Sequence, residues 1–196
     1  MRRTTINVLA FGGGFVIMAL ELLGGRVLAP YFGSSIYVWG SVITVFMLSL
    51  SLGYLAGGYI SLRSPSLARF AALFVAGAVL TYPLVLYAEQ LMQLVFQHIE
   101  DPRYGSLVAA SSLFMLPTVV LGMISPYSVR LMVTETAQSG RVAGTLYFVS
   151  TLGSALGTLA TSFYLVLWFE INAILLLLTG ILLALAALGY AVGRAS

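Results

Sequence analysis

The sequence contains no cysteine and no lysine, and only 8% of its residues are charged. Without cysteine there is no disulfide framework, no thiolate metal site and no cysteine nucleophile. With 60% apolar residues, a soluble domain of this size would have no polar surface. The basic residues behind the net charge of +3 are scattered along the chain, so no nucleic-acid partner is expected.

What the sequence does contain is a series of long apolar runs separated by short polar loops. Each run is long enough for a helix that spans a hydrocarbon core, which requires roughly 20 residues. The six runs cover about residues 6–25, 37–60, 70–87, 107–124, 143–169 and 171–192. We therefore expect an all-α polytopic membrane protein with six transmembrane helices, in which residues 1–196 form a single membrane domain in the lipid bilayer.

The arginines indicate an orientation. If the N-terminus is cytoplasmic, seven of the nine arginines lie inside, and only Arg26 and Arg103 lie outside. The positive-inside rule then predicts that both termini are cytoplasmic, in a cell membrane that we expect to be a bacterial inner membrane. The first run is too long for a signal peptide, is interrupted by Glu21 and lacks a small-residue cleavage site, so we expect a retained helix.

Small residues recur at spacings of four in the second and fifth runs, as Gly53 with Gly57 and Gly153 with Gly157. In a three-plus-three inverted repeat, which resembles half of a major facilitator transporter, these two helices would be equivalent. The stripe of small residues in the fifth run comprises Ser150, Gly153, Ser154, Gly157, Thr158 and Thr161. It indicates either close helix packing or a polar path lined by its hydroxyl groups.

Glu21 is an ionisable group inside the first run, roughly 22 Å into a core of about 30 Å. A carboxylate at that depth is costly unless it faces a cavity, has a charged partner or takes up a proton. Arg26 is the nearest candidate partner, provided that Gly24 and Gly25 break the helix between them. Two interpretations stay open: a structural ion pair, or a site for substrate binding or proton coupling.

Aromatic residues follow closely, with Tyr31, Tyr37 and Trp39 near the expected outer interface. Aromatic residues at this depth typically belong to an interfacial belt. Alternatively, together with Glu21 and Arg26 they form a substrate site, in which ring faces and a carboxylate hold an organic cation such as a polyamine.

Several short segments carry a resemblance to a known family over nearly the whole chain. They are residues 21–33 (ELLGGRVLAPYFG), 37–40 (YVWG), Gly53-Tyr54 with Gly57-Gly58, 125–130 (SPYSVR), 140–144 (GRVAG) and 150–158 (STLGSALGT). In these segments the chain resembles the membrane domain of spermidine-synthase-like integral membrane proteins, which fuse a major facilitator-like domain to a spermidine synthase domain. The resemblance implies a stand-alone version of the membrane half, because the fused members continue into a soluble aminopropyltransferase domain.

No catalytic site is predicted. The sequence has no glycine-rich nucleotide-donor loop after a strand and no acidic pair placed to hold an amine substrate. His98 has Glu100 and Asp101 nearby, a set that indicates either a weak metal site or, as we expect, a solvated loop. No serine lies in a strand–turn–helix elbow with a histidine base. We expect neither enzymatic activity nor a metal or other cofactor.

Two functions fit these features. The first is a small transporter for a cationic solute such as a polyamine, with Glu21 as its carboxylate. Six helices make half of a standard facilitator, so this function predicts a homodimer. The second is a non-transporting accessory or anchoring subunit for a separate aminopropyltransferase or a membrane complex, with residues 130–141 as the docking surface. The buried acid on a glycine-rich helix favours transport.

Overall fold

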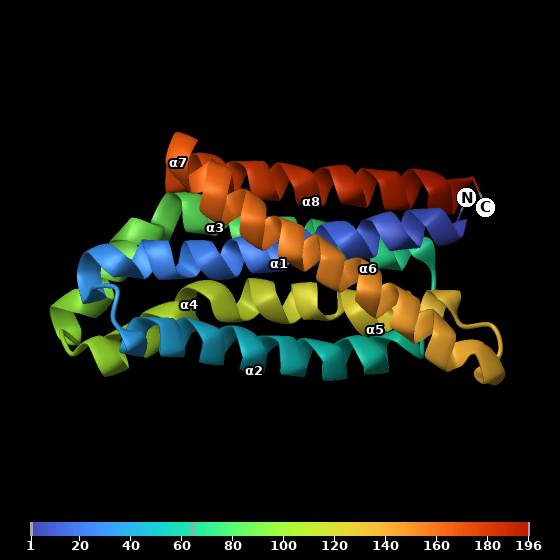
Figure 1. The fold of residues 1–196 in the computed structure, drawn as a ribbon, viewed down its shortest axis with the longest axis horizontal. Coiled ribbons are helices and arrows are strands. Elements are labelled where there is room, and N and C mark those ends of the chain that lie inside the picture. Colours follow the sequence, from blue (N-terminus) through green and yellow to red (C-terminus); the bar gives the residue numbers. More distant parts are fainter. Residues whose placement is uncertain (1, 64, 196) are drawn as a thin grey trace.

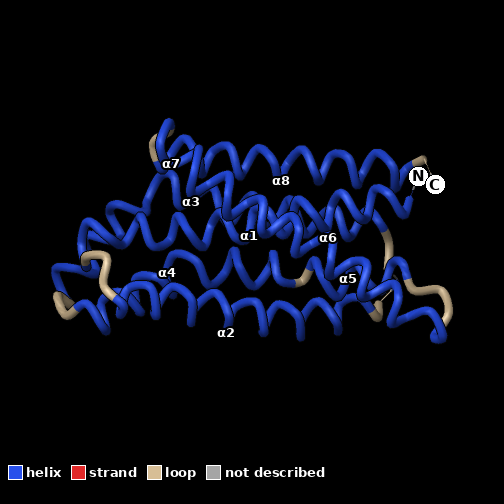
Figure 2. The backbone as a smooth tube through the Cα atoms, in the orientation of Figure 1, coloured by secondary structure: helices blue, strands red, loops and turns tan. Residues whose placement is uncertain are grey.

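The computed structural model describes residues 2–63 and 65–195, and this part of the chain consists of helices joined by short loops, with no strand (Figures 1 and 2). The α-helices are α1 (Arg2–Phe32), α2 (Ile36–Ser61), α3 (Leu67–His98), α4 (Pro102–Gly122), α5 (Ile124–Met132), α6 (Ser139–Ala160), α7 (Val166–Trp168) and α8 (Ile171–Arg194). A 3₁₀-helix, η1 (Thr136–Gln138), precedes α6, and a π-helix, η2 (Thr161–Leu165), joins α6 to α7.

Six helical segments of the described chain are long and apolar enough to cross a membrane, as the apolar runs predicted. α4 continues into α5, and α6 continues through η2 into α7, so each of these pairs forms one span. The spans alternate in direction, and the start of α1 and the end of α8 lie at the same end of the bundle (Figure 1). We call this the terminus end and the opposite one the far end.

The predicted helix boundaries were too short at several places. α1 was expected to end at residue 25, but it continues to Phe32 and is not broken at Gly24 and Gly25. It ends where Gly33 adopts a left-handed φ of 77°, the usual glycine termination of a helix. α3 was expected to end at residue 87 and reaches His98. Hydropathy finds the apolar part of a helix, whereas a polar extension such as 88–98 keeps the helical conformation without adding to that signal.

α1 occupies the centre of the bundle and contacts each of the other spans. Its most extensive contact is with α6, and the other large contacts join α2 to α4 and α3 to α8. Large aromatic side chains fill the interior between α2, α3, α4 and α5. Those that are fully buried are Phe46, Phe70, Phe74, Phe114 and Tyr127. The Tyr127 ring of α5 stacks on Phe70 of α3 at 5.6 Å, which fixes α5 against the bundle.

α2 and α4 approach each other at backbone contact distance. A Cβ atom added to Gly53 would overlap the carbonyl oxygen of Val119, and one added to Gly57 would lie 2.6 Å from the Cα atom of Met123. Inside a bilayer, close packing drives helix association because the lipid chains are as apolar as the side chains. The glycine pair of α2 therefore sets the distance between these two helices.

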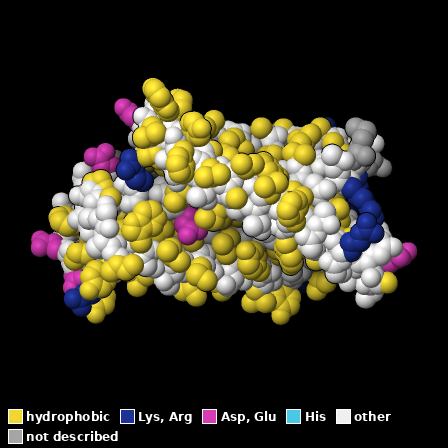
Figure 3. Space-filling model, in the orientation of Figure 1, with side chains coloured by type: hydrophobic (Ala, Val, Ile, Leu, Met, Phe, Trp, Pro, Cys, Tyr) yellow, Lys and Arg dark blue, Asp and Glu magenta, His cyan; other side chains and the backbone are white. Residues whose placement is uncertain are grey.

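α6 and α1 meet in the same way. A Cβ atom added to Gly153 would overlap the carbonyl oxygen of Phe11, and one added to Gly157 would overlap that of Phe15. α6 is held mainly by this contact, because it crosses the surface of the bundle (Figure 1) and its span is the least buried of the six. Its outward side is covered by apolar side chains (Figure 3).

This packing predicts that Gly153→Ala destabilises the protein by about 1–3 kcal/mol, the usual cost of forcing an extra group into a packed interior. The measurement is the midpoint of unfolding in detergent, by heat or by a denaturing detergent. The matched control is Gly144→Ala in the same helix, where an added Cβ meets no atom within 4 Å. Equal midpoints for the two variants would show that the close contact of α6 with α1 does not stabilise the fold.

Candidate functional site

Glu21 lies in the membrane-spanning part of α1, where its side chain is half-buried. Among the residues that the structure describes, its carboxylate forms neither a hydrogen bond nor an ion pair. Arg26 does not reach it. Because α1 stays helical, five residues place the two side chains about 140° apart around the helix axis. The break at Gly24 and Gly25 that would have brought them together does not occur.

One helical turn before Glu21, α1 forms the floor of a groove between α2, α5 and α6, with a volume of about 450 Å³. Its polar side chains are Tyr54, Ser125, Tyr147, Ser150, Thr151 and Ser154. Ile17 and Met18 also line this central groove, and they precede Glu21 by four and three residues. Residues at these spacings share one face of a helix, so Glu21 lies on the same face of α1 as the groove, one turn closer to the far end.

The hydroxyl residues of α6 have different environments. Ser150 and Ser154 line the central groove, and the Ser154 hydroxyl donates to the carbonyl oxygen of Gly14 at 3.2 Å. The Thr158 hydroxyl instead donates to the Ser154 carbonyl oxygen of its own helix at 3.0 Å. Thr161 is fully buried where η2 begins, and its hydroxyl has no hydrogen-bond partner among the described residues. The predicted polar stripe therefore lines the groove only in its first half.

The three aromatic residues predicted to surround Glu21 lie in three separate places. Tyr31 packs edge-on against Phe96 of α3, with ring centroids 6.1 Å apart. The Trp39 ring covers Gly25 on α1, where an added Cβ would lie 2.7 Å from the indole. The Tyr37 ring carries the Arg103 guanidinium at 5.2 Å from its centroid. None of these ring contacts includes Glu21.

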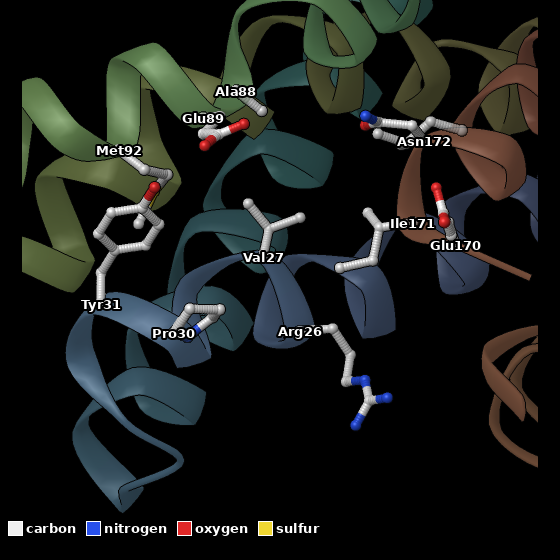
Figure 4. A pocket seen from close by; sticks show the side chains of 11 residues that line it. Arg26, Val27, Pro30, Tyr31, Ala88, Glu89, Met92, Glu170, Ile171 and Asn172 are labelled. Atoms are coloured by element: carbon white, nitrogen blue, oxygen red, sulfur yellow. The ribbon is translucent and has the colours of Figure 1, made fainter.

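Arg26 and Tyr31 instead line a second cavity, at the far end between α1, α3 and the start of α8 (Figure 4). This far-end cavity has a volume of about 460 Å³. Its other polar side chains are Glu89, Glu170 and Asn172, which were not among the predicted site residues. No signal in the sequence indicates them, because only the packing of α3 against α8 brings their positions together.

The two ends of the bundle carry opposite charge. By the order of the elements, the far end holds four carboxylates, Glu89, Glu100, Asp101 and Glu170, against the two guanidinium groups of Arg26 and Arg103. The terminus end holds the seven other arginines against the single carboxylate of Glu135. A surface of one sign raises the local concentration of ions of the other sign, so the far end attracts cations.

His98 and Asp101 both make local contacts at the junction of α3 and α4. His98 lies in the last turn of α3, where its Nδ1 is 2.9 Å from the Leu94 carbonyl oxygen. Asp101 caps α4 by accepting a hydrogen bond from the Arg103 backbone N–H at 2.8 Å. Among the described residues, no three histidine, aspartate or glutamate side chains are grouped so that they could hold a metal ion.

No protein-family model, no curated protein and no solved structure matches the chain. The resemblance to the membrane domain of spermidine-synthase-like proteins therefore stays a prediction, and the function has to be inferred from the geometry of the two cavities and of Glu21.

Proposed function

We propose that the protein is a membrane transporter for a small organic cation, acts as a homodimer, and uses Glu21 as the carboxylate that binds the cation or a coupling proton. The observation that carries this proposal is an unpaired carboxylate inside a membrane span, in line with a groove of polar side chains. A charged group at this depth is expensive, and in membrane proteins it typically marks the path of an ion or a proton.

The internal symmetry of the contacts supports a transporter architecture. Gly14 of α1 faces the carbonyl oxygen of Ser150 in α6, and Gly122 of α4 faces that of Leu50 in α2. The glycine pairs of α2 and α6 likewise pack on α4 and α1. If α1 is matched with α4, and α6 with α2, the contacts between α1 and α6 correspond to those between α4 and α2. An inverted three-plus-three repeat, as in half of a major facilitator, would produce this correspondence.

A second copy of the chain would complete the transport path. The central groove opens on the face between α2 and α6, where Tyr54 and Tyr147 are exposed. In a monomer this face and the half-exposed Glu21 would contact lipid, whereas in a two-fold dimer they would enclose a shared cavity. By the positive-inside rule, the arginine-rich terminus end would face the cytoplasm of the cell membrane.

The alternative function is that of an accessory or anchoring subunit, and the residues that would serve it lie at the terminus end. Arg130, Glu135 and Arg141 are exposed there, and η1 lies between α5 and α6. These groups could dock a separate soluble protein such as an aminopropyltransferase. If the protein is an accessory subunit, Glu21 takes no part in moving a solute, so a measurement of solute flux distinguishes the two functions.

Transport predicts saturable uptake of labelled putrescine or spermidine into proteoliposomes, altered by a pH gradient if a proton is coupled. Glu21→Gln should lower the rate at least tenfold, because it removes the negative charge but keeps the size of the side chain. Glu100→Gln, an exposed acid at the far end, serves as the control and should transport normally.

Folding of each variant is checked by its elution as a single species in detergent. If folded wild-type protein gives no more flux than empty liposomes, polyamine transport is excluded, and capture of a soluble partner by the terminus end becomes the test of the accessory function.

The dimer predicts a specific crosslinking pattern, which the absence of cysteine makes simple to measure. Thr151→Cys on the rim of the central groove should give a crosslinked dimer with a short bis-maleimide in membranes. Leu183→Cys, exposed on α8 outside the groove, should not. Crosslinking at Leu183 but not at Thr151 would place the dimer interface on the α8 face and contradict an interface at the central groove.

A further inference from the structure

The far-end cavity has the size of a small-molecule site. It is formed by three helices that are distant in sequence, and its volume of about 460 Å³ lies within the range of ligand pockets in proteins. Most of its wall is apolar, from Val27, Pro30, Ala88, Met92, Ile171 and Leu175. The far-end cavity and the central groove have no lining residue in common.

Two carboxylates from different elements give this cavity its charge. Glu89 belongs to α3 and Glu170 directly precedes α8. Glu170 starts that helix without a side-chain capping bond, and the only hydrogen bond of the Glu89 carboxylate with the described residues is a long one, 3.4 Å from Gln93 Nε2. Both carboxylates therefore keep acceptor sites for a ligand.

The arginine of this cavity does not neutralise them. In Figure 4 the Arg26 side chain leaves α1 on the side opposite to Val27, which projects toward α3 and α8. No ion pair joins Arg26 to Glu89 or Glu170 among the described residues. With Glu89 and Glu170 against Arg26, the lining of the cavity carries a net negative charge, in agreement with the excess of carboxylates at the far end of the bundle.

The arrangement also suggests the shape of the ligand. Val27 and Ile171 lie between Glu89 and Glu170 in Figure 4, so apolar surface separates the two charges. The Asn172 amide and the Tyr31 hydroxyl add polar groups beside this surface. A short alkyl chain would cover the apolar wall, and an ammonium group at each of its ends would meet a carboxylate.

We propose that the far-end cavity binds a linear alkyl diamine, with one ammonium group held by Glu89 and the other by Glu170. The inference depends on the proposed transport function only for what happens to the ligand afterwards, because the cavity would be its first binding site on the path to Glu21. Binding itself is measurable without flux, which keeps the two proposals separable.

The test uses the full-length protein in lipid nanodiscs of phosphatidylcholine and phosphatidylglycerol, which contain no primary amine. Radiolabelled putrescine should bind saturably, and n-butylamine, which has the same chain but one ammonium group, should compete at least tenfold more weakly. Glu89→Gln and Glu170→Gln should each weaken putrescine binding about tenfold or more, because each removes one charged hydrogen-bond acceptor.

Three control variants sharpen the result. Glu100→Gln should leave binding unchanged, since this far-end acid does not line the cavity. Arg26→Gln should tighten binding, because it removes a positive charge near the cavity, and loss of binding in this variant would show that the ligand is an anion. If Glu21→Gln alone abolishes binding, the site is at Glu21 and the far-end cavity is excluded.

The remaining outcomes are also decisive. Butylamine that competes as well as putrescine would overturn the two-carboxylate arrangement. If replacing phosphatidylcholine by phosphatidylethanolamine abolishes putrescine binding, the occupant is the amine of a lipid headgroup, and the soluble diamine is the wrong ligand. Binding that depends on both glutamates in a protein without flux would support this inference and contradict transport.

Discussion

Close backbone contact between helices, above all where α6 crosses α1, is the constraint on which the rest of the structure depends. In a hydrocarbon environment apolar side chains gain little by leaving lipid for protein, so helices associate where small residues allow dense packing. Glycines supply this packing where α6 crosses α1 and where α2 meets α4. Because α1 is fixed by contacts with all other spans, Glu21 is held at one depth and on one face.

The number of spans could be predicted correctly from the sequence, because six apolar runs of about 20 residues are rare outside membrane proteins. The ends of α1 and α3 could not be predicted: α1 stays helical past Gly24 and Gly25, where a break was expected, and through Pro30, and α3 continues into a segment rich in polar residues that is compatible with a helix. One regular helix was expected for residues 143–169, where the structure has a π-helix at Thr161–Leu165. Periodicity does not reveal a single wider turn, and nothing in this structure explains why it occurs there.

The two candidate sites differed in how far the sequence could reveal them. Glu21 is conspicuous in the sequence, because a carboxylate within an apolar run is rare and costly. The far-end cavity could not be found in this way. Glu89 and Glu170 each lie at a span end, where an acid is ordinary, and only the packing of α3 against α8 gives them a common cavity. For the same reason Tyr31 was grouped with Glu21, although it packs on α3.

The unpaired state of Glu21 also bears on the functional unit. An ion pair with Arg26 would have given the carboxylate a purely structural role within a monomer, and that pair is not formed. A half-exposed carboxylate in a lipid-facing surface has three ways to lower its free energy: uptake of a proton, binding of a cation, or burial against another protein surface. Proton uptake and cation binding would be steps of a transport cycle, whereas burial against another protein surface would form an interface. Because Glu21 shares a face of α1 with the central groove between α2 and α6, a second copy on this face would enclose the carboxylate and the groove together, so in the proposed dimer the interface and the transport path would be the same surface.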